Sequence, residues 1–298
     1  MTLRQLESFL AVAREGSFSL AAQRLHLSQP TLTEHVQELE REIGKRLFAR
    51  RYRQVVLTEA GRVLEPYVSC VMTTLESGTQ AVTELDGLQH GSLLVGASTT
   101  PGIYVLPRII GHFRATYPGI TLSLQIANTL TIEERIRGAR LDIGVVGGHL
   151  LGAGEQCLTA GLVDELVLIA PPNHAWAKRG TVGIKQLSEQ PLLMREEGSA
   201  TRHLTERALQ RTGLPYQVAM ELDHTEAIKQ AVMAGLGISF VSAHAVRREI
   251  AAGHLISLRV RGLALHRHFH VIHAQRRPLS ASAQAFVRLL EAEATSKR

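Results

Sequence analysis

Residues 17–33 read SFSLAAQRLHLSQPTLT, and this stretch decides the fold of the first part of the chain. It predicts two short helices joined by a tight turn. Ser19 is expected to cap the first helix, and the small side chains of Ala21 and Ala22 let a neighbouring helix approach closely. Ser28 is expected to cap the second helix. A helix pair of this kind is typical of proteins that bind the major groove of DNA.

The second helix carries an apolar face and a polar face. Pro30 falls in its first turn, where a backbone amide has no partner within the helix, so the proline does not break it. Apolar residues then recur at helical spacing and are expected to face a core: Leu32, Val36, Leu39 and Ile43. Short polar side chains remain on or near the outer side, where they suit a major groove: Gln29, Thr31, Thr33, Glu34 and Gln37.

A basic segment follows this helix. Residues 44–58, GKRLFARRYRQVVLT, predict a short strand, a basic tip and a return strand, which together form a wing. The segment has no acidic residue and five cations: Lys45, Arg46, Arg50, Arg51 and Arg53. Such a cluster beside a helix pair can neutralise DNA phosphates. The alternative is a solvated basic turn, and the neighbouring helices favour the wing.

Residues at fixed spacings between positions 9 and 61 form a longer pattern. They are Phe9, Ser17-Phe18, Ala21-Ala22, Leu25, Ser28-Gln29-Pro30, Thr33, Leu39-Glu40, Gly44, Leu47-Phe48-Ala49-Arg50 and Leu57-Thr58-Glu59-Ala60-Gly61. In this pattern the chain resembles the DNA-binding domain of the LysR-type transcriptional regulators. It departs from the family at Glu34, where a basic or neutral polar residue is common, and at His35, where an amide is common. A carboxylate at position 34 repels phosphate but can accept a hydrogen bond from a cytosine amino group.

The resemblance completes the expected DNA interface. We expect base contacts from the start of the second helix, with Glu34 and His35 as further candidates, and phosphate contacts from Ser28 and the wing arginines. The expected DNA-binding residues are Ser28, Gln29, Pro30, Thr31, Thr33, Glu34, His35, Arg50, Arg51 and Arg53.

Composition agrees with a soluble intracellular protein, which we expect in the cytoplasm, and the resemblance implies a bacterial one. The chain has 298 residues, of which 45% are hydrophobic, and no apolar run reaches membrane-spanning length. The first residues, MTLRQLE, lack the apolar core of a secretion signal. The formal net charge of +6 favours polyanionic partners. Cys70 and Cys157 form neither a disulfide framework nor a metal-ligand pattern, and a redox switch is not expected.

A long helix is predicted from Gly61 onwards. Apolar or small residues recur along it with alternating steps of four and three: Leu64, Val68, Val71, Leu75, Gly78, Val82 and Leu85. This stripe must pack, either against the same helix of a second subunit or against its own domain. The family uses a linker helix for dimerisation, which favours the first option. Pro66 lies inside the helix and is expected to bend it.

Beyond residue 91 short apolar runs alternate with helical stretches, which is typical of an α/β domain. We expect strands at 93–97, 120–126, 143–146, 166–170, 192–194, 217–222, 238–241 and 268–273. The expected fold is α/β throughout, with a winged helix-turn-helix at 1–58 and a linker helix at 59–89. An effector-binding domain follows at 90–298, with lobe one at 90–162 and 267–298 and lobe two at 163–266. The resemblance implies the two-lobed fold of periplasmic solute-binding proteins.

Hydroxyl-rich loops mark the expected effector site. Residues 98–102, STTPG, follow the first strand of lobe one, and residues 198–202, GSATR, open a helix of lobe two. Each run alone fits a helix cap, but their corresponding places in the two lobes favour a cleft that holds a small anion. The expected effector-binding residues are Ser98, Thr99, Thr100, Asn128, Gly147, Gly148, Ser199, Thr201, Arg202 and Thr225.

Other functions fit less well. A metal site at His266, His268 and His270 is disfavoured because a strand spreads these side chains apart and no carboxylate is adjacent. No nucleophile elbow, phosphate loop or dinucleotide fingerprint supports an enzyme. A transport binding protein fits residues 91 onwards but not the DNA-reading head.

We therefore expect a DNA-binding transcriptional regulator with no catalytic residues and no cofactor, controlled by a small oxyanion or carboxylate bound between two lobes. Its expected partners are double-stranded promoter DNA, further copies of itself in a homodimer or homotetramer, and RNA polymerase. No membrane contact is expected.

Overall fold

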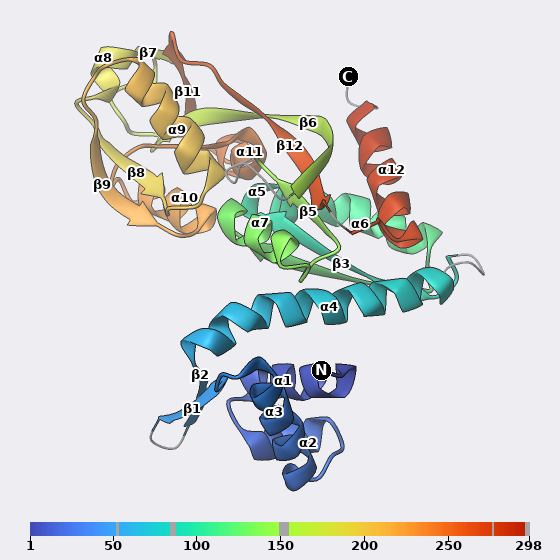
Figure 1. Ribbon diagram of the computed structural model, residues 1–298. Coiled ribbons are helices and arrows are strands. Elements are labelled where there is room, and N and C mark those ends of the chain that lie inside the picture. The colour runs from blue at the N-terminus through green and yellow to red at the C-terminus, as the bar shows by residue number, and fades with distance from the viewer. Residues whose placement is uncertain (52–53, 84–87, 149–154, 276, 296–298) are drawn as a thin grey trace. The chain divides into compact units, whose positions relative to one another are not determined.

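The computed structural model describes residues 1–51, 54–83, 88–148, 155–275 and 277–295. Contacts divide the chain into two compact units. Unit one is built on residues Met1–Val82, and unit two on residues Thr83–Arg137 and Leu141–Arg298 (Figure 1). In the described ranges no helix is long and apolar enough to cross a membrane.

Three helices form the core of unit one. They are α1 (Leu3–Glu15), α2 (Phe18–Arg24) and α3 (Gln29–Ile43). The apolar face predicted for α3 is confirmed, because Leu32, Val36 and Leu39 are buried in the core that α1 and α2 share. Ser28 caps α3 as expected, through a hydrogen bond from the Thr31 amide to its Oγ. The cap of α2 is Ser17 instead of Ser19, because the helix begins one residue before Ser19.

The expected wing is a two-stranded antiparallel hairpin. Its strands are β1 (Phe48–Arg51) and β2 (Gln54–Leu57), with Phe48 opposite Leu57. Glu40 of α3 fixes the start of the hairpin by accepting hydrogen bonds from the amides of Leu47 and Phe48. The wing is therefore anchored to the predicted recognition helix. Arg53 lies outside the described residues.

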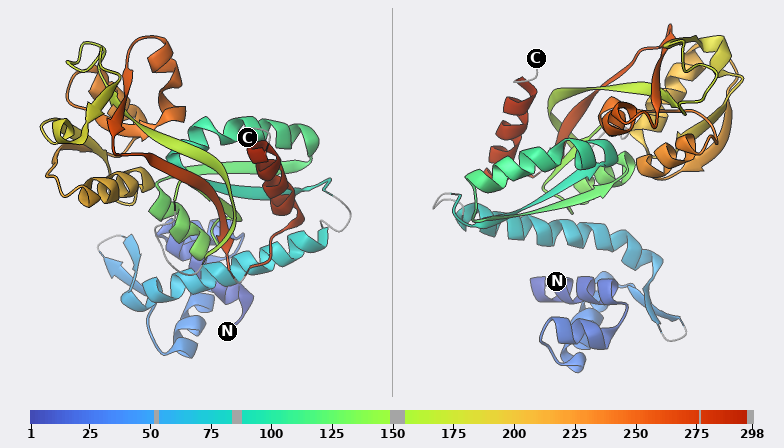
Figure 2. Two further views of the ribbon diagram at one scale, coloured as in Figure 1. Left: turned by 90° about the horizontal axis from the view of Figure 1, so that it is seen from above. Right: turned by 180° about the vertical axis from the view of Figure 1, so that it is seen from behind.

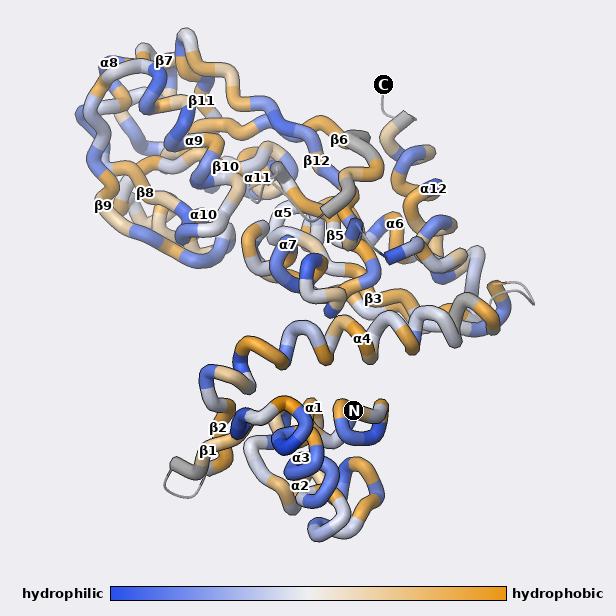
Figure 3. The backbone as a smooth tube through the Cα atoms, in the orientation of Figure 1, coloured by the Kyte–Doolittle hydropathy of each residue, from blue (hydrophilic) through white to orange (hydrophobic). Residues whose placement is uncertain are grey.

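The long helix α4 (Glu59–Thr83) runs through Pro66. Leu64 and Val68 of its predicted stripe pack into the core of unit one, so for them the alternative of packing within their own domain holds. Hydrophobic residues recur along α4 (Figure 3). Five of the large apolar side chains that the structure describes on this helix are exposed: Val71, Leu75 and Val82 of the predicted stripe, and Val63 and Tyr67, which lie outside it. The preferred prediction, that the stripe packs on a second subunit, is therefore corrected at Leu64 and Val68, which their own unit covers. Leu85 lies outside the described residues.

Unit two holds ten strands and eight helices within the described ranges. The strands are β3 (Gly91–Ser98), β4 (Ile120–Ala127), β5 (Ile143–Val146), β6 (Glu155–Ala170), β7 (Thr181–Gly183), β8 (Pro191–Arg195), β9 (Gln217–Leu222), β10 (Ser239–Ser242), β11 (Ile256–Arg261) and β12 (Leu265–Ala274). The helices are α5 (Thr99–Tyr104), α6 (Leu106–Thr116), α7 (Thr129–Arg137), α8 (Ile184–Leu187), α9 (Ala200–Arg211), α10 (Thr225–Met233), α11 (Ala243–Ala251) and α12 (Ala281–Thr295).

The first lobe is a sheet covered on both faces. β3 pairs in parallel with β4 and β5, and β5 pairs antiparallel with β12. Helices α6 and α12 cover one face, where Phe113 and Phe286 meet edge to face at 5.3 Å. Helix α7 covers the other face with Ile132 and Ile136. The last strand and the last helix thus return to the first lobe, as the sequence predicted.

Two long antiparallel strands join the lobes. β6 and β12 pair along most of their length, and β6 continues into the second lobe to pair with β10 and β11 (Figures 1 and 2). The sequence predicted only the last third of β6 and neither β7 nor β11. Since β6 and β12 are continuous, residues along them can reach groups from both lobes.

Candidate functional site

A groove lies along the outer face of α3. It is lined by Gln29, Pro30, Thr33, Glu34 and Gln37. Ser19 donates a hydrogen bond to Gln29 Oε1 at 2.9 Å, which orients the Gln29 amide. All the lining residues except Gln37 belong to the DNA-binding set expected from the sequence, and all lie on the first three turns of the helix, the part of a recognition helix that enters the major groove.

His35 does not lie on this face. Its Nδ1 is 3.0 Å from Ser8 Oγ of α1, so the ring bridges two helices of unit one. Thr31 is half-buried and exchanges a hydrogen bond with Ser28 Oγ at 2.7 Å. The expectation that His35 reads bases is corrected, because its position in the helical turn directs the ring towards α1.

A second groove lies beside the start of the wing. Gln37 and Glu40 of α3 line it together with Lys45 and Arg46. Both cations are exposed. The backbone of Arg50 and Arg51 lies on β1. Cations thus flank the polar face of α3, which is the arrangement that holds DNA phosphates beside a base-reading helix.

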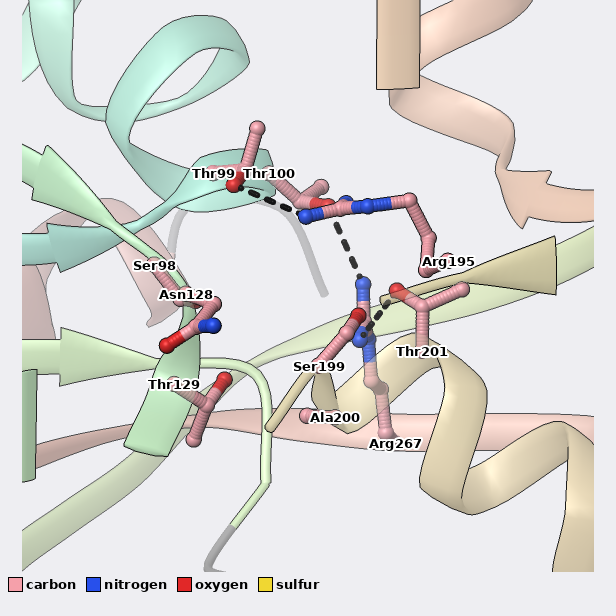
Figure 4. A pocket seen from close by; sticks show the side chains of 10 residues that line it. All are labelled: Ser98, Thr99, Thr100, Asn128, Thr129, Arg195, Ser199, Ala200, Thr201 and Arg267. Atoms are coloured by element: carbon pink, nitrogen blue, oxygen red, sulfur yellow. Dashed lines mark hydrogen bonds between the residues drawn. The ribbon is translucent and has the colours of Figure 1, made fainter. Parts of the chain in front are cut away.

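Unit two contains a small polar cavity between its lobes. It is lined by Ser98, Thr99, Thr100, Asn128, Thr129, Arg195, Ser199, Ala200, Thr201 and Arg267 (Figure 4). The cavity volume is about 10 Å³, which is the room that one water molecule needs. Hydroxyl groups from α5 in the first lobe and α9 in the second lobe face it, so both lobes contribute.

Arg267 of β12 ties the two lobes together. Its NH2 donates to Thr100 Oγ1 at 3.2 Å and its NH1 donates to Thr201 Oγ1 at 3.0 Å. Its Nε donates to Asp164 of β6 at 2.8 Å, and Ser242 Oγ donates to the other oxygen of Asp164 at 2.5 Å. Burial lowers the pKa of the Arg267 guanidinium, the Asp164 carboxylate opposes this shift, and the charge of Arg195 adds to it. The guanidinium stays charged, since arginine is not deprotonated in proteins.

Arg195 ends β8 and is the second buried guanidinium of the cavity. It donates from NH1 to Thr225 Oγ1 at 2.9 Å and from NH2 to Thr99 Oγ1 at 3.3 Å. Its Nε and NH2 also form a bidentate pair with Glu196 at 2.7 and 2.9 Å. Two cations therefore face one cavity, each with a hydroxyl partner from the first lobe.

Several residues expected at an effector site lie at this cavity. Ser98, Thr99, Thr100, Asn128, Ser199 and Thr201 line it. Thr225 lies behind Arg195, and the Gly147 amide donates to Ser98 Oγ. A side chain at Gly147 would collide with the Arg267 guanidinium, whereas Gly148 lies against Ala200.

Arg202 is a correction to the expected set. It does not line the cavity, because its guanidinium pairs with Glu206 and Glu221 on the surface of the second lobe. These two carboxylates raise the pKa of Arg202 through hydrogen bonds. Arg202 also donates to the Arg195 carbonyl at 3.1 Å, so it supports the backbone next to the cavity.

Sequence reasoning missed the two arginines that do line the cavity. A signal for Arg267 was present. It belongs to the same series of every second residue as Leu265, Phe269 and Val271, and all of these are buried. Arg195 comes directly after the continuous buried run at residues 192–194 and is buried as well. A charged residue in register with buried neighbours indicates a functional group or a buried ion pair.

The alternating histidines of β12 have different surroundings. His266 and His268 are exposed, and His270 Nδ1 lies 3.4 Å from Cys157 Sγ. Among the residues that the structure describes, no three His, Cys, Asp or Glu side chains are placed to hold one metal ion.

Family models match both units. Residues 3–62 match the bacterial regulatory helix-turn-helix protein of the lysR family, and residues 86–295 match the LysR substrate binding domain. The chain belongs to the LysR family. It is a DNA-binding transcriptional regulator with a two-lobed effector domain, and its relatives are named for regulation and not for catalysis.

Relatives of this LysR protein are similar over nearly the whole chain. The HTH-type transcriptional activator CmpR of Synechocystis is 37% identical, with 96% of this chain and 93% of the relative covered. The RuBisCO operon transcriptional regulator of Allochromatium vinosum is 35% identical, with 99% and 97% covered.

Solved structures agree with the fold. A single-residue variant of full-length OxyR from Pseudomonas aeruginosa has a TM-score of 0.74 at 23% identity, and the match covers 99% of this chain and 94% of that protein. The regulatory domain of CcmR from Synechocystis PCC6803, in complex with 2-phosphoglycolate, has a TM-score of 0.65 at 31% identity. That match covers 69% of this chain and 98% of the CcmR domain.

Proposed function

We propose that the effector of this regulator is a small molecule with two anionic groups, such as a phosphate and a carboxylate, and that it binds between Arg195 and Arg267. The observation that carries the proposal is the pair of buried guanidinium groups facing one cavity. Guanidinium groups bind carboxylates and phosphates in bidentate geometry, and burial strengthens such pairs. The complex of the related CcmR domain with 2-phosphoglycolate supports this ligand class.

The hydroxyl groups of the cavity suit the same ligand. Ser98, Thr99 and Thr100 come from the first lobe, and Ser199 and Thr201 come from the second. Hydroxyls can donate to anionic oxygens while the arginines supply the charge. An anion held by both lobes changes how far they close, because the cavity volume of about 10 Å³ must grow to admit it.

Effector binding is proposed to change transcription of a nearby operon. The names of the relatives favour genes of the RuBisCO type as targets. The protein would contact bases through Gln29, Thr33 and Glu34 and hold phosphates with the wing, in the bacterial cytoplasm and together with RNA polymerase. Activation is favoured by the activator name of CmpR.

We further propose that two copies pair through α4. Five apolar residues of this helix are exposed, with Val63, Tyr67 and Val82 more than half exposed at 62%, 70% and 67%. A row of this kind is stabilised when the same helix of a second chain covers it. A homodimer, and a homotetramer built from dimers, would present two recognition helices to a palindromic operator.

The test is DNA binding with and without 2-phosphoglycolate. Fluorescence anisotropy measures the affinity of the full-length protein for DNA from upstream of its own gene, and footprinting measures which bases are protected. We expect 2-phosphoglycolate to change the affinity or the footprint, and glycolate or inorganic phosphate at the same concentration to have a weaker effect.

Matched threonine variants link the response to the cavity. The double variant Thr100→Val with Thr201→Val removes two hydroxyl partners of Arg267 and should abolish the response. Thr205→Val removes a buried hydroxyl one turn along α9, which donates to the Thr201 carbonyl, and should keep it. If neither DNA affinity nor footprint responds to 2-phosphoglycolate in the wild type, the proposed effector class is wrong.

A further inference from the structure

The two arginines of the cavity differ in how their charges are balanced. Arg267 is paired with Asp164, whose side chain is fully buried and is held from both sides by Arg267 and Ser242. Arg195 is paired with Glu196, whose side chain is 17% exposed. The two carboxylates neutralise the two guanidinium groups, so the net charge of the four groups is zero.

The Glu196 carboxylate is held by one residue, whereas the Asp164 carboxylate is held by two. Its two oxygens accept from Nε and NH2 of Arg195, and across the described ranges no other group donates to them. It lies in the short loop between β8 and α9, next to the exposed residue Glu197 and to Gly198, whose φ is +80°. The Asp164 carboxylate, in contrast, cannot leave without breaking bonds to two other buried side chains.

Glu196 occupies one edge of the Arg195 guanidinium. A guanidinium has five N–H donors in a fixed fork. On Arg195, Glu196 takes the Nε and NH2 edge. NH1 also donates to Thr225, and NH2 also donates to Thr99 and to the Asp223 carbonyl. An effector carboxylate or phosphate that pairs with the Nε and NH2 edge of Arg195 must therefore take the place of Glu196.

We propose that Glu196 is a displaceable internal counter-ion of Arg195, which competes with the anionic group of the effector for the same edge of the guanidinium. This inference rests on the proposed function of the cavity and adds a specificity-determining residue to it. A weakly held anion, such as a lone carboxylate, fails to displace Glu196. An anion that also binds Arg267 and the hydroxyls gains enough to displace it.

Two effects follow from the loss of the Glu196 charge. The first is tighter anion binding, because the side chain at position 196 is then neutral and no longer competes with the anion for Arg195. The second is lower stability without added anion, because a buried guanidinium that has lost its carboxylate is strongly destabilising. The bound anion supplies the missing charge, so the second effect disappears at saturation.

The experiment compares Glu196→Gln with Glu197→Gln in the full-length protein. Glu197→Gln removes the same negative charge one residue away. The exposed Glu197 side chain has no hydrogen bond or ion pair within the described part of the chain. Isothermal titration calorimetry with 2-phosphoglycolate, glycolate and inorganic phosphate measures affinity, and differential scanning calorimetry measures Tm with and without each anion. Glu196→Ala serves as a second variant if Glu196→Gln does not fold.

We expect Glu196→Gln to bind 2-phosphoglycolate at least tenfold more tightly than the wild type and to gain measurable affinity for inorganic phosphate. Glu197→Gln should stay within twofold of the wild type. Without added anion the Tm of Glu196→Gln should lie several degrees below that of Glu197→Gln, and saturating anion should close this gap.

The remaining outcomes separate the inference from the proposed function. If the wild type binds 2-phosphoglycolate and Glu196→Gln binds it equally or more weakly, the counter-ion inference is wrong and the proposed effector class stands. If only Glu196→Gln binds an anion, the inference is supported and 2-phosphoglycolate is not the natural effector. If neither protein binds any of the three anions, both the effector class and the inference are overturned.

Discussion

Arg267 Nε donates to Asp164 Oδ2 at 2.8 Å across the pair of strands that joins the lobes, although the two residues lie 103 positions apart in the chain. Both side chains are buried. The ion pair holds the guanidinium at the point where Thr100 of the first lobe and Thr201 of the second lobe reach it. The relationship therefore connects the long-range packing of β6 and β12 with the cavity.

Asp164→Asn should strongly destabilise the protein. The change leaves the buried Arg267 charge without its carboxylate, which costs about 3–5 kcal/mol when one partner of a buried pair is removed. Ser242→Ala removes the hydroxyl that donates to Asp164 and that caps α11 by accepting from the His244 amide, and it should cost about 2 kcal/mol. Urea denaturation followed by circular dichroism measures both. A loss below about 1 kcal/mol for Asp164→Asn would mean that the pair does not hold Arg267.

Glu34→Gln and His35→Ala should have different effects on DNA recognition. Glu34 is exposed on the outer face of α3, so exchanging its carboxylate for an amide should change base preference. His35 contacts Ser8 inside unit one, so its loss should lower the free energy of unfolding by about 1 kcal/mol and leave base preference unchanged. Selection from a random DNA library compares the two variants. A changed consensus with His35→Ala would refute the structural role given to this ring.

Leu75→Glu and Val68→Glu should separate pairing from folding. Leu75 is 48% exposed on α4, so a charge there should dissociate a dimer and leave the melting temperature of unit one unchanged. Val68 is 3% exposed in the core of unit one, so the same substitution should unfold that unit. Sedimentation velocity measures the mass of the assembly, and circular dichroism measures the melting temperature of the protein. A Leu75→Glu protein of unchanged mass would exclude pairing through this row.

His273 should make unit two less stable in mild acid. Burial lowers the pKa of His273 below its ordinary value of 6.5, while hydrogen bonds to the carbonyls of Arg277 and Ala274 oppose the shift. Below pH 6.5 the unfolded chain therefore binds a proton that the folded chain does not, so stability is complete above this pH and is lost as the pH falls towards the folded pKa. Urea midpoints between pH values of about 7.5 and 5 should fall less steeply in His273→Gln. Equal slopes would assign the acid sensitivity to other groups.

Local pattern was sufficient to predict unit one. Helical spacing placed Leu32, Val36 and Leu39 in the core, and the sequence of caps and turns predicted the helix pair and the wing. The position of α4 against this unit was harder to predict. Val68 and Val71 are both apolar and both fit a heptad, but only the tertiary fold determines that Val68 is buried and Val71 exposed.

The cavity was predicted in outline and not in its charges. The hydroxyls of Thr99, Thr100 and Thr201 follow strands or open helices, which is visible in a sequence. Arg267 reaches them because β12 crosses between the lobes, and its pairing with Asp164 depends on a register between strands far apart in the chain. Arg202 looked like the natural anion ligand because it lies next to Thr201, yet the helical turn directs it to Glu206 instead.

A crystal structure of the full-length protein with 2-phosphoglycolate is the first measurement to make, because it shows where the effector binds. The proposed site predicts electron density for the ligand between Arg195 and Arg267, with one anionic group within hydrogen-bond distance of Arg195 Nε and NH2 and the other within reach of Arg267, Thr100 and Thr201. Density for the ligand elsewhere on the protein, or none between the two arginines at a saturating concentration, would contradict it.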